Sequence, residues 1–213
     1  MPRRPLVLAS ASPARLGLLR TAGLAPEVMV SGVDEDGLEG LDAVAAAASL
    51  SVRKATAVAE RLRVHERRAL DALGPDDRPL VVGCDSVLAF GGEVRGKPRS
   101  AEQAAAWWRG YRSREGTLVT GHTVVDVDAG TEAAATTQTR VRFGCPTDAE
   151  IDAYVATGEP LAVAGAFTLD GYGAPFVDGI DGDHGTVLGL SLPLLRRLLA
   201  ELDVAITDLW ASG

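Results

Sequence analysis

Lysine is scarce in this chain, and both of its lysines lie where phosphate chemistry can use them. Of the 21 lysines and arginines, only Lys54 and Lys97 are lysines. A surface that needs only positive charge accepts either type. The retained lysines are therefore candidates for a compact ammonium among several phosphate oxygens, where a flat guanidinium does not fit. Chance survival, or an apolar stem with a solvated ammonium, explains the composition equally well. The setting favours phosphate, because Lys97 follows a predicted strand that ends in Asp85 and Lys54 lies on a long predicted helix.

Asp85 is the candidate carboxylate for acid–base chemistry. It follows the apolar run 80–84, which predicts a buried strand. A carboxylate at the end of such a strand is costly unless it is paired, bound to a metal or placed at a cleft. An aspartate that only turns the chain is the alternative, which is weakened because apolar sequence resumes at Val87. A turn at Gly91-Gly92 can then bring Lys97 back toward Asp85.

A second candidate site precedes the first predicted helix. Ser10, Ser12 and Arg15 lie where an apolar strand at residues 5–9 leads into a helix that begins at Pro13. Free backbone amides, two hydroxyls and a guanidinium at a helix N-terminus can converge on an anion. Taken alone, the segment is better explained as an ordinary helix cap. It matches neither the Walker pattern nor the dinucleotide-binding fingerprint.

The stretch 157–187 is rich in glycine and contains one of the three histidines. Glycines at this density indicate backbone that runs close to a ligand, and an ordinary irregular connection is the alternative. His184 in this stretch is expected to be a loop residue without an assigned role. His122, which lies in a strand pattern, is expected to be a structural histidine.

Composition restricts the class of protein. The 46% of hydrophobic and 23% of charged residues are ordinary for a globular protein. No apolar run approaches the roughly 20 residues of a membrane span, and the apolar stretch near the N-terminus is too short for a signal peptide. Cys84 and Cys145 lack metal-type spacing, so we expect both to be small core residues of a cytoplasmic protein.

The distribution of charge limits the partners. The net charge is −8 and the pI is near 4.9, which argues against a nucleic-acid polymer. Between Arg142 and Arg196 there are eight acidic residues and no Lys or Arg. An anionic ligand is therefore expected to meet a local basic pocket, helped by a metal cation.

Strand and helix patterns alternate along the chain. The alternation predicts one α/β domain over residues 1–213, with a mixed sheet that can divide into two lobes. The expected strands cover residues 5–9, 27–31, 80–84, 87–90, 117–127 and 136–143. The expected helices cover residues 13–22, 41–73 (one helix or two), 100–108, 147–155 and 190–202, with Ser12, Ser100 and Thr147 as caps.

Together, these blocks resemble the Maf family of nucleoside triphosphate pyrophosphatases, and the order and spacing of the blocks make the resemblance specific. The matching blocks are Ala9-Ser10-Ala11-Ser12-Pro13, Val33-Asp34-Glu35, Arg53-Lys54-Ala55, Asp85-Ser86-Val87, Gly96-Lys97-Pro98, Thr120-Gly121, Thr157-Gly158-Glu159, Ala164-Gly165-Ala166-Phe167 and Val187-x-Gly189-Leu190. The resemblance implies hydrolysis between the α and β phosphates with a divalent metal, Mg²⁺ or Mn²⁺. It also implies an elongated mixed α/β fold around a central cleft, similar to inosine triphosphate pyrophosphatases.

The resemblance assigns roles to individual residues. Asp85 matches the catalytic carboxylate that activates water, and Glu35 matches an acid that helps Asp85 to hold the metal. The positions that contact phosphate match Ser10, Arg15, Lys54 and Lys97.

Departures from the family pattern bear on the base. Ala14 stands where members often carry an Arg, and Asp170 replaces the Gln of pyrimidine-preferring members. Asp170 is similar to the Glu of the subgroup that acts on 7-methylguanosine triphosphate. We expect Ala14, Ser86 and Asp170 to determine base specificity, with 7-methyl-GTP as a candidate substrate and UTP or dTTP as the alternative.

Two other functions stay open. One is a regulator of septum formation that binds nucleotide without turnover, and the other is a phosphatase that removes the terminal phosphate. The intact set of Asp85, Lys54 and Lys97 favours the pyrophosphatase. The expected partner is a nucleoside triphosphate, with no nucleic-acid polymer and no membrane, and a homodimer is a further possibility.

Overall fold

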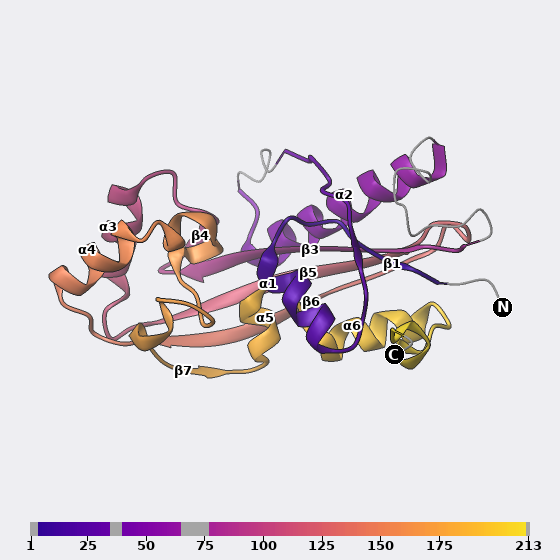
Figure 1. The fold of residues 1–213 in the computed structure, drawn as a ribbon. Helices are drawn as coiled ribbons and strands as arrows, with labels where there is room; N and C mark the ends of the chain where they lie inside the picture. Colours follow the sequence, from indigo (N-terminus) through magenta and orange to yellow (C-terminus); the bar gives the residue numbers. More distant parts are fainter. Residues whose placement is uncertain (1–3, 35–39, 65–76, 212–213) are drawn as a thin grey trace.

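A mixed seven-stranded sheet forms the centre of the protein (Figure 1). The computed structural model describes residues 4–34, 40–64 and 77–211. The strands have the order β2-β1-β3-β5-β6-β7, and β4 pairs with β3. They are β1 (Leu6–Leu8), β2 (Glu27–Val28), β3 (Leu80–Phe90), β4 (Glu93–Arg95), β5 (Glu115–Asp126), β6 (Glu132–Phe143) and β7 (Val177–Asp181). The pairs of β1 with β2 and β3 are parallel and the others antiparallel, which confirms the predicted mixed α/β class.

Helices flank both faces of the sheet. On one face, α2 (Ala43–Val64) packs its alanines against Val81 and Val125. On the other face, α1 and α6 pack near Cys84, and α3 and α4 pack farther along β3, around Leu88 (Figure 1). The helices on that side are α1 (Pro13–Thr21), α3 (Ala101–Tyr111), α4 (Asp148–Ala156), α5 (His184–Leu188) and α6 (Leu192–Glu201).

Hydroxyl caps determine where three helices begin. The side chains of Ser12, Ser100 and Thr147 each accept a hydrogen bond from the backbone N–H three residues later. Such a bond satisfies an amide that has no partner inside the helix. The predicted starts of α1, α3 and α4 are confirmed.

The strand that carries Asp85 is longer than predicted. β3 continues through Asp85, where the sequence predicts a strand end, because β5 pairs with it from Leu80 to Ala89. Asp85 itself lies opposite Gly121 in this ladder. The prediction of two strands separated at Asp85 is therefore wrong.

Other expectations are corrected at single residues. Cys84 is buried as predicted, but Cys145 is exposed. His184 begins α5 and does not lie in a loop, since the predicted final helix is preceded by this short one. Residues 65–76 of the predicted helix 41–73 lie outside the described residues. Among the described helices, none is long and apolar enough to cross a membrane.

Candidate active site

Asp85 and Ser86 point to opposite faces of the sheet, because successive side chains alternate along a strand. Asp85 contacts Lys54 of α2, and Ser86 contacts Arg15 of α1. β5 occupies one edge of β3, while β1 and β4 pair with residues 80–82 and 88–90 of the other edge. Residues 83–87 of this edge are paired with no described strand. Asp85 and Ser86, which point to opposite faces of the sheet, both lie in this unpaired stretch.

Two glycines let α2 approach the sheet closely. A Cβ built at Gly83 would lie 2.5 Å from the carbonyl oxygen of Ser51, and one built at Gly121 would lie 2.1 Å from that of Ala47. Neither distance is possible for a side chain, so only glycine permits this packing. Lys54 lies one turn beyond Ser51 and is thereby placed over Asp85.

Lys54 and Asp85 form an ion pair that is largely removed from water. Lys54 Nζ donates to Asp85 Oδ1, and the two side chains are 11% and 9% exposed. Asp85 Oδ2 has no hydrogen-bond partner among the described residues. The pair joins the predicted carboxylate to one of the two predicted lysines.

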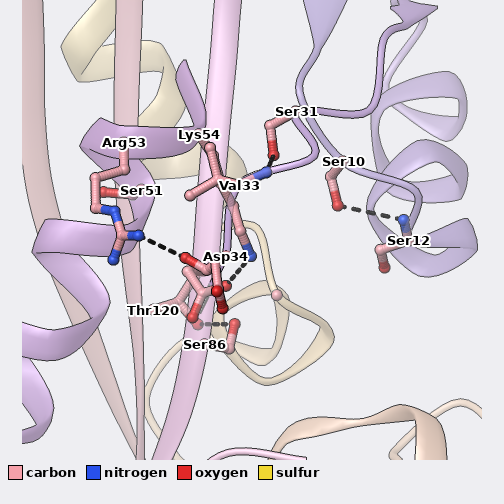
Figure 2. A network of polar contacts seen from close by, with 12 residues as sticks. Ser10, Ser12, Ser31, Val33, Asp34, Ser51, Arg53, Lys54, Ser86 and Thr120 are labelled. Carbon is pink, nitrogen blue, oxygen red and sulfur yellow. Dashed lines mark hydrogen bonds and ion pairs between the residues drawn. The ribbon is translucent and has the colours of Figure 1, made fainter. Parts of the chain in front are cut away.

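The segment before the undescribed residues 35–39 lies next to Lys54. Arg53 Nη2 donates to the backbone oxygen of Asp34 at 2.6 Å, and Figure 2 shows Asp34 beside Lys54. Glu35, the predicted second metal ligand, is the next residue and lies outside the described part of the chain. Within that part, no three His, Cys, Asp or Glu side chains are grouped so that they could hold a metal ion.

Arg15 is buried on the other face of the sheet, with only 9% of its surface exposed. It donates to Ser10 Oγ at 3.0 Å, to Ser86 Oγ at 3.2 Å and to the Gly189 carbonyl at 2.8 Å. Each of these acceptors is neutral, and no acidic residue in the described chain forms an ion pair with Arg15. A buried cation without a counter-ion is costly, so a bound anion would be stabilised by this guanidinium.

Two ionisable neighbours of the site are held neutral. Burial raises the pKa of the Cys84 thiol to about 12, so this thiol is not a nucleophile. Burial, together with the positive charge of Arg15, lowers the pKa of His122 to about 4. His122 Nε2 accepts a hydrogen bond from Ser191 N at 2.7 Å, which confirms the structural histidine that the sequence predicts.

The other predicted residues are not joined to Asp85 by any described contact. Lys97 is exposed after β4 and forms no ion pair with a described residue. Asp170 is exposed in a loop whose backbone at Tyr172 donates to Glu159. Ala14 is half-buried in the first turn of α1. The structure therefore forms two groups of contacts that meet at the neighbours Asp85 and Ser86, namely Lys54 with Asp85 and Arg15 with Ser10 and Ser86, and it leaves Lys97, Ala14 and Asp170 as predictions.

Comparison with known proteins shows which family the chain belongs to. The family described as Maf-like protein matches residues 5–202. The chain belongs to this family. The Maf-like chain is 60% identical over 212 residues to a protein of Streptomyces coelicolor named nucleoside triphosphate pyrophosphatase, which covers 100% of this chain and 97% of the relative. Proteins of the same name from Streptomyces avermitilis and Cutibacterium acnes are 57% and 52% identical, covering 98% and 96% of this chain and 96% and 93% of their own lengths.

Two residues at this Maf-like site have no role assigned from the sequence. Thr120 is fully buried and bonds to Ser86 Oγ at 2.9 Å, and Gly189 supplies the carbonyl that Arg15 binds. Both belong to blocks that carry the family resemblance, Thr120-Gly121 and Val187-x-Gly189-Leu190. The blocks thus marked the positions, but the contacts depend on residues far apart in the sequence.

Proposed function

We propose that this protein hydrolyses nucleoside triphosphates to nucleoside monophosphate and pyrophosphate. One observation carries the proposal: Asp85, which is paired with Lys54, is followed in β3 by Ser86, which accepts a hydrogen bond from Arg15, and Arg15 is buried without an acidic partner in the described chain. Such a site combines a carboxylate for water with an unbalanced cation for a polyphosphate. The names of the relatives support the same reaction.

In this reaction, Asp85 acts on the water that attacks the α phosphorus. Asp85 Oδ2 accepts a proton from the water molecule while the oxygen of that water molecule forms a bond to the α phosphorus. The bond from the α phosphorus to the bridging oxygen breaks, and that oxygen leaves with pyrophosphate. Arg15 and Lys54 stabilise the charge on the phosphate oxygens, and the Lys54 bond to Oδ1 holds the carboxylate in place.

A divalent metal shared with the substrate is proposed beside Asp85. Mg²⁺ is usually held by one or two carboxylates together with substrate phosphates, and not by a cage of protein ligands alone. Asp85 provides one such carboxylate, and Glu35 is proposed as the second. When bound, Mg²⁺ or Mn²⁺ would neutralise phosphate charge.

Asp170 is proposed to favour a guanine-type base. A carboxylate only accepts hydrogen bonds, whereas the amide of Gln both donates and accepts. Guanine presents two neighbouring donors, which a carboxylate can bind together, while uracil and thymine present one donor between two acceptors. A 7-methyl group adds positive charge to the ring and strengthens the preference. UTP and dTTP are the alternative substrates.

Product analysis over a panel of nucleotides tests the reaction. The purified protein is incubated with Mg²⁺ and 7-methyl-GTP, GTP, UTP or dTTP, and products are separated by ion-exchange chromatography. Monophosphate with pyrophosphate supports the proposal. Diphosphate with orthophosphate would instead identify a phosphatase, and unchanged nucleotide would favour a binding protein that acts in septum formation.

A further inference from the structure

Arg15 has donors left over after its contacts inside the protein. Its acceptors come from three segments, namely Ser10 from the loop before α1, Ser86 from β3 and the Gly189 carbonyl after α5. A guanidinium has five N–H donors, so two remain after these three bonds. Any segment that sets the orientation of the guanidinium therefore also sets where the remaining donors point.

The Ser86 hydroxyl is oriented by a directional chain of hydrogen bonds. Thr120 Oγ1 lies 2.7 Å from the Thr186 carbonyl, which only accepts, so the Thr120 hydroxyl is the donor there. The 2.9 Å bond between Ser86 and Thr120 must then have Ser86 as its donor. Ser86 consequently turns lone pairs toward Arg15, which only donates. The one proton of Ser86 is committed to Thr120 and is not available to a substrate.

Two of the three supports of Arg15, those through Ser86 and Gly189, end at the short helix α5 or at the residue that caps it. The Thr186 carbonyl accepts from Thr120 and also from the backbone N–H of Gly189, at 3.2 Å. The carbonyl of Gly189 in turn accepts from Arg15 Nε. Thr186 Oγ1 donates to Thr137 on β6 at 2.9 Å, so this point of α5 is itself tied to the sheet.

Position 189 has no room for a side chain while Arg15 stays in place. Gly189 ends α5 with a φ of 98°, and a Cβ built there lies 2.8 Å from Arg15 Nε and 3.4 Å from Cζ. Contacts this short force a displacement. The flexible Arg15 side chain is the group that can move, because the neighbouring backbone is held by α5.

We propose that Thr120 and Gly189 are positioning residues that hold the Arg15 guanidinium for the triphosphate, with α5 as their common support. The inference rests on the proposed pyrophosphatase function, and it assigns Ser86 to the support of Arg15. Neither positioning residue touches the substrate in this arrangement. Their effect on the reaction passes through Arg15 alone.

A double-mutant cycle with Arg15 tests the dependence. Gly189→Ala and Thr120→Val are each made in the parent and in Arg15→Ala, and kcat/KM for pyrophosphate release is measured. Gly189→Ala should lower kcat/KM by about 10- to 100-fold in the parent, since a displacement of about 1 Å can cost 100-fold. Thr120→Val should lower it by about 2- to 10-fold, the value of one neutral hydrogen bond. In Arg15→Ala, both effects should shrink to about twofold or less.

Backbone strain is controlled with a second glycine. Gly130 also has a positive φ, of 69°, but a Cβ there meets only ordinary contact with Arg63 Nη2 at 3.7 Å, in the distant β5–β6 turn. Gly130→Ala should lower the melting temperature as Gly189→Ala does, yet leave kcat/KM unchanged. The affinity for inorganic pyrophosphate, measured by calorimetry, should fall with Gly189→Ala and not with Gly130→Ala.

The outcomes separate the two proposals. Equal losses from Gly189→Ala and Thr120→Val in both Arg15 backgrounds would overturn the positioning role and leave the pyrophosphatase function standing. If Gly189→Ala does not fold, the Thr120→Val cycle decides alone. A parent that releases no pyrophosphate from any nucleotide would overturn the proposed function, and the positioning role with it.

Discussion

The two cations of the site, Lys54 and Arg15, have opposite surroundings. Lys54 reaches β3 from α2 and is paired with Asp85, whereas Arg15 reaches β3 from α1 and contacts only neutral oxygens of Ser10, Ser86 and Gly189. On the first face, the negative charge of Asp85 opposes the positive charge of Lys54. The guanidinium on the second face is not balanced by a described residue, so a bound anion gains most there.

This difference suggests that the two faces of β3 have separate functions. In the proposed reaction, the Asp85 face holds the group that acts on water, and the Arg15 face holds the charge that attracts the polyphosphate. Because Asp85 and Ser86 are neighbours in β3, the two functions are held at a constant separation by the strand itself. Five experiments test this division, from the largest expected effect to the smallest.

Removal of divalent metal should abolish hydrolysis. Oxygen ligands such as Asp85 suit hard cations, and activity should return with Mg²⁺ or Mn²⁺. Pyrophosphate release is measured before chelation, after chelation and after each metal is restored. Undiminished hydrolysis after thorough chelation would show that no metal at Asp85 is needed for the reaction.

Asp85→Asn should lower kcat by about 10²–10⁴-fold, the usual contribution of a positioned general base. The substitution keeps the shape of the side chain and removes the proton acceptor. Nucleotide binding, measured by calorimetry, should persist in Asp85→Asn and weaken in Arg15→Ala. Near-normal turnover would place the base elsewhere, with Glu35 the next candidate. Melting temperatures check the fold, because the substitution leaves Lys54 without its charged partner.

Lys54→Arg should lower kcat/KM by about 10- to 100-fold, although the charge is kept, because a fork-shaped guanidinium does not reproduce the buried ammonium contact with Asp85. Lys97→Arg should have a smaller effect, since Lys97 is exposed and its stem is not confined. Steady-state kinetics of both variants provide the comparison. Parent-like activity in both would show that the scarcity of lysine carries no functional information.

Asp170→Gln should shift base preference from guanine toward uracil and thymine, by about 1–3 kcal/mol, the usual value of a bidentate pair with a base. The ratio of kcat/KM for 7-methyl-GTP and GTP against UTP and dTTP is measured in parent and variant. If the parent prefers pyrimidine nucleotides, or if the substitution does not change the ranking of the nucleotides, Asp170 does not take part in base recognition.

The pKa of His122 should report on the Arg15 face. Burial and the charge of Arg15 lower this pKa to about 4, so Arg15→Ala should raise it, and bound pyrophosphate should raise it in the parent. Since the unfolded chain binds the proton near pH 6.5, the free energy of unfolding should fall as the pH drops from 6.5 toward 4. Imidazole NMR titration follows the first effect and chemical denaturation the second. If the pKa of His122 is unchanged in Arg15→Ala, the charge of Arg15 does not act on His122.

Much of the local structure follows from the sequence. The caps at Ser12, Ser100 and Thr147 act over three residues, so the starts of their helices could be predicted. The path of β3 through Asp85 could not be predicted, because in the sequence pattern a polar residue such as Asp85 marks the end of an apolar strand. Pairing with β5 on the far side of Asp85 continues the strand, and that pairing is a long-range contact.

The candidate residues of the site could be predicted from the sequence. Scarcity of lysine marked Lys54, the apolar run marked Asp85, and the hydroxyl-rich helix start marked Arg15. That Lys54 is paired and largely removed from water while Lys97 is exposed depends on the tertiary structure. The tertiary structure also decided that Arg15 is held by a carbonyl 174 residues away. The physical reason is that residue type and spacing act over a few residues, whereas burial, pairing of charges and the room left beside a glycine depend on which distant segments pack together.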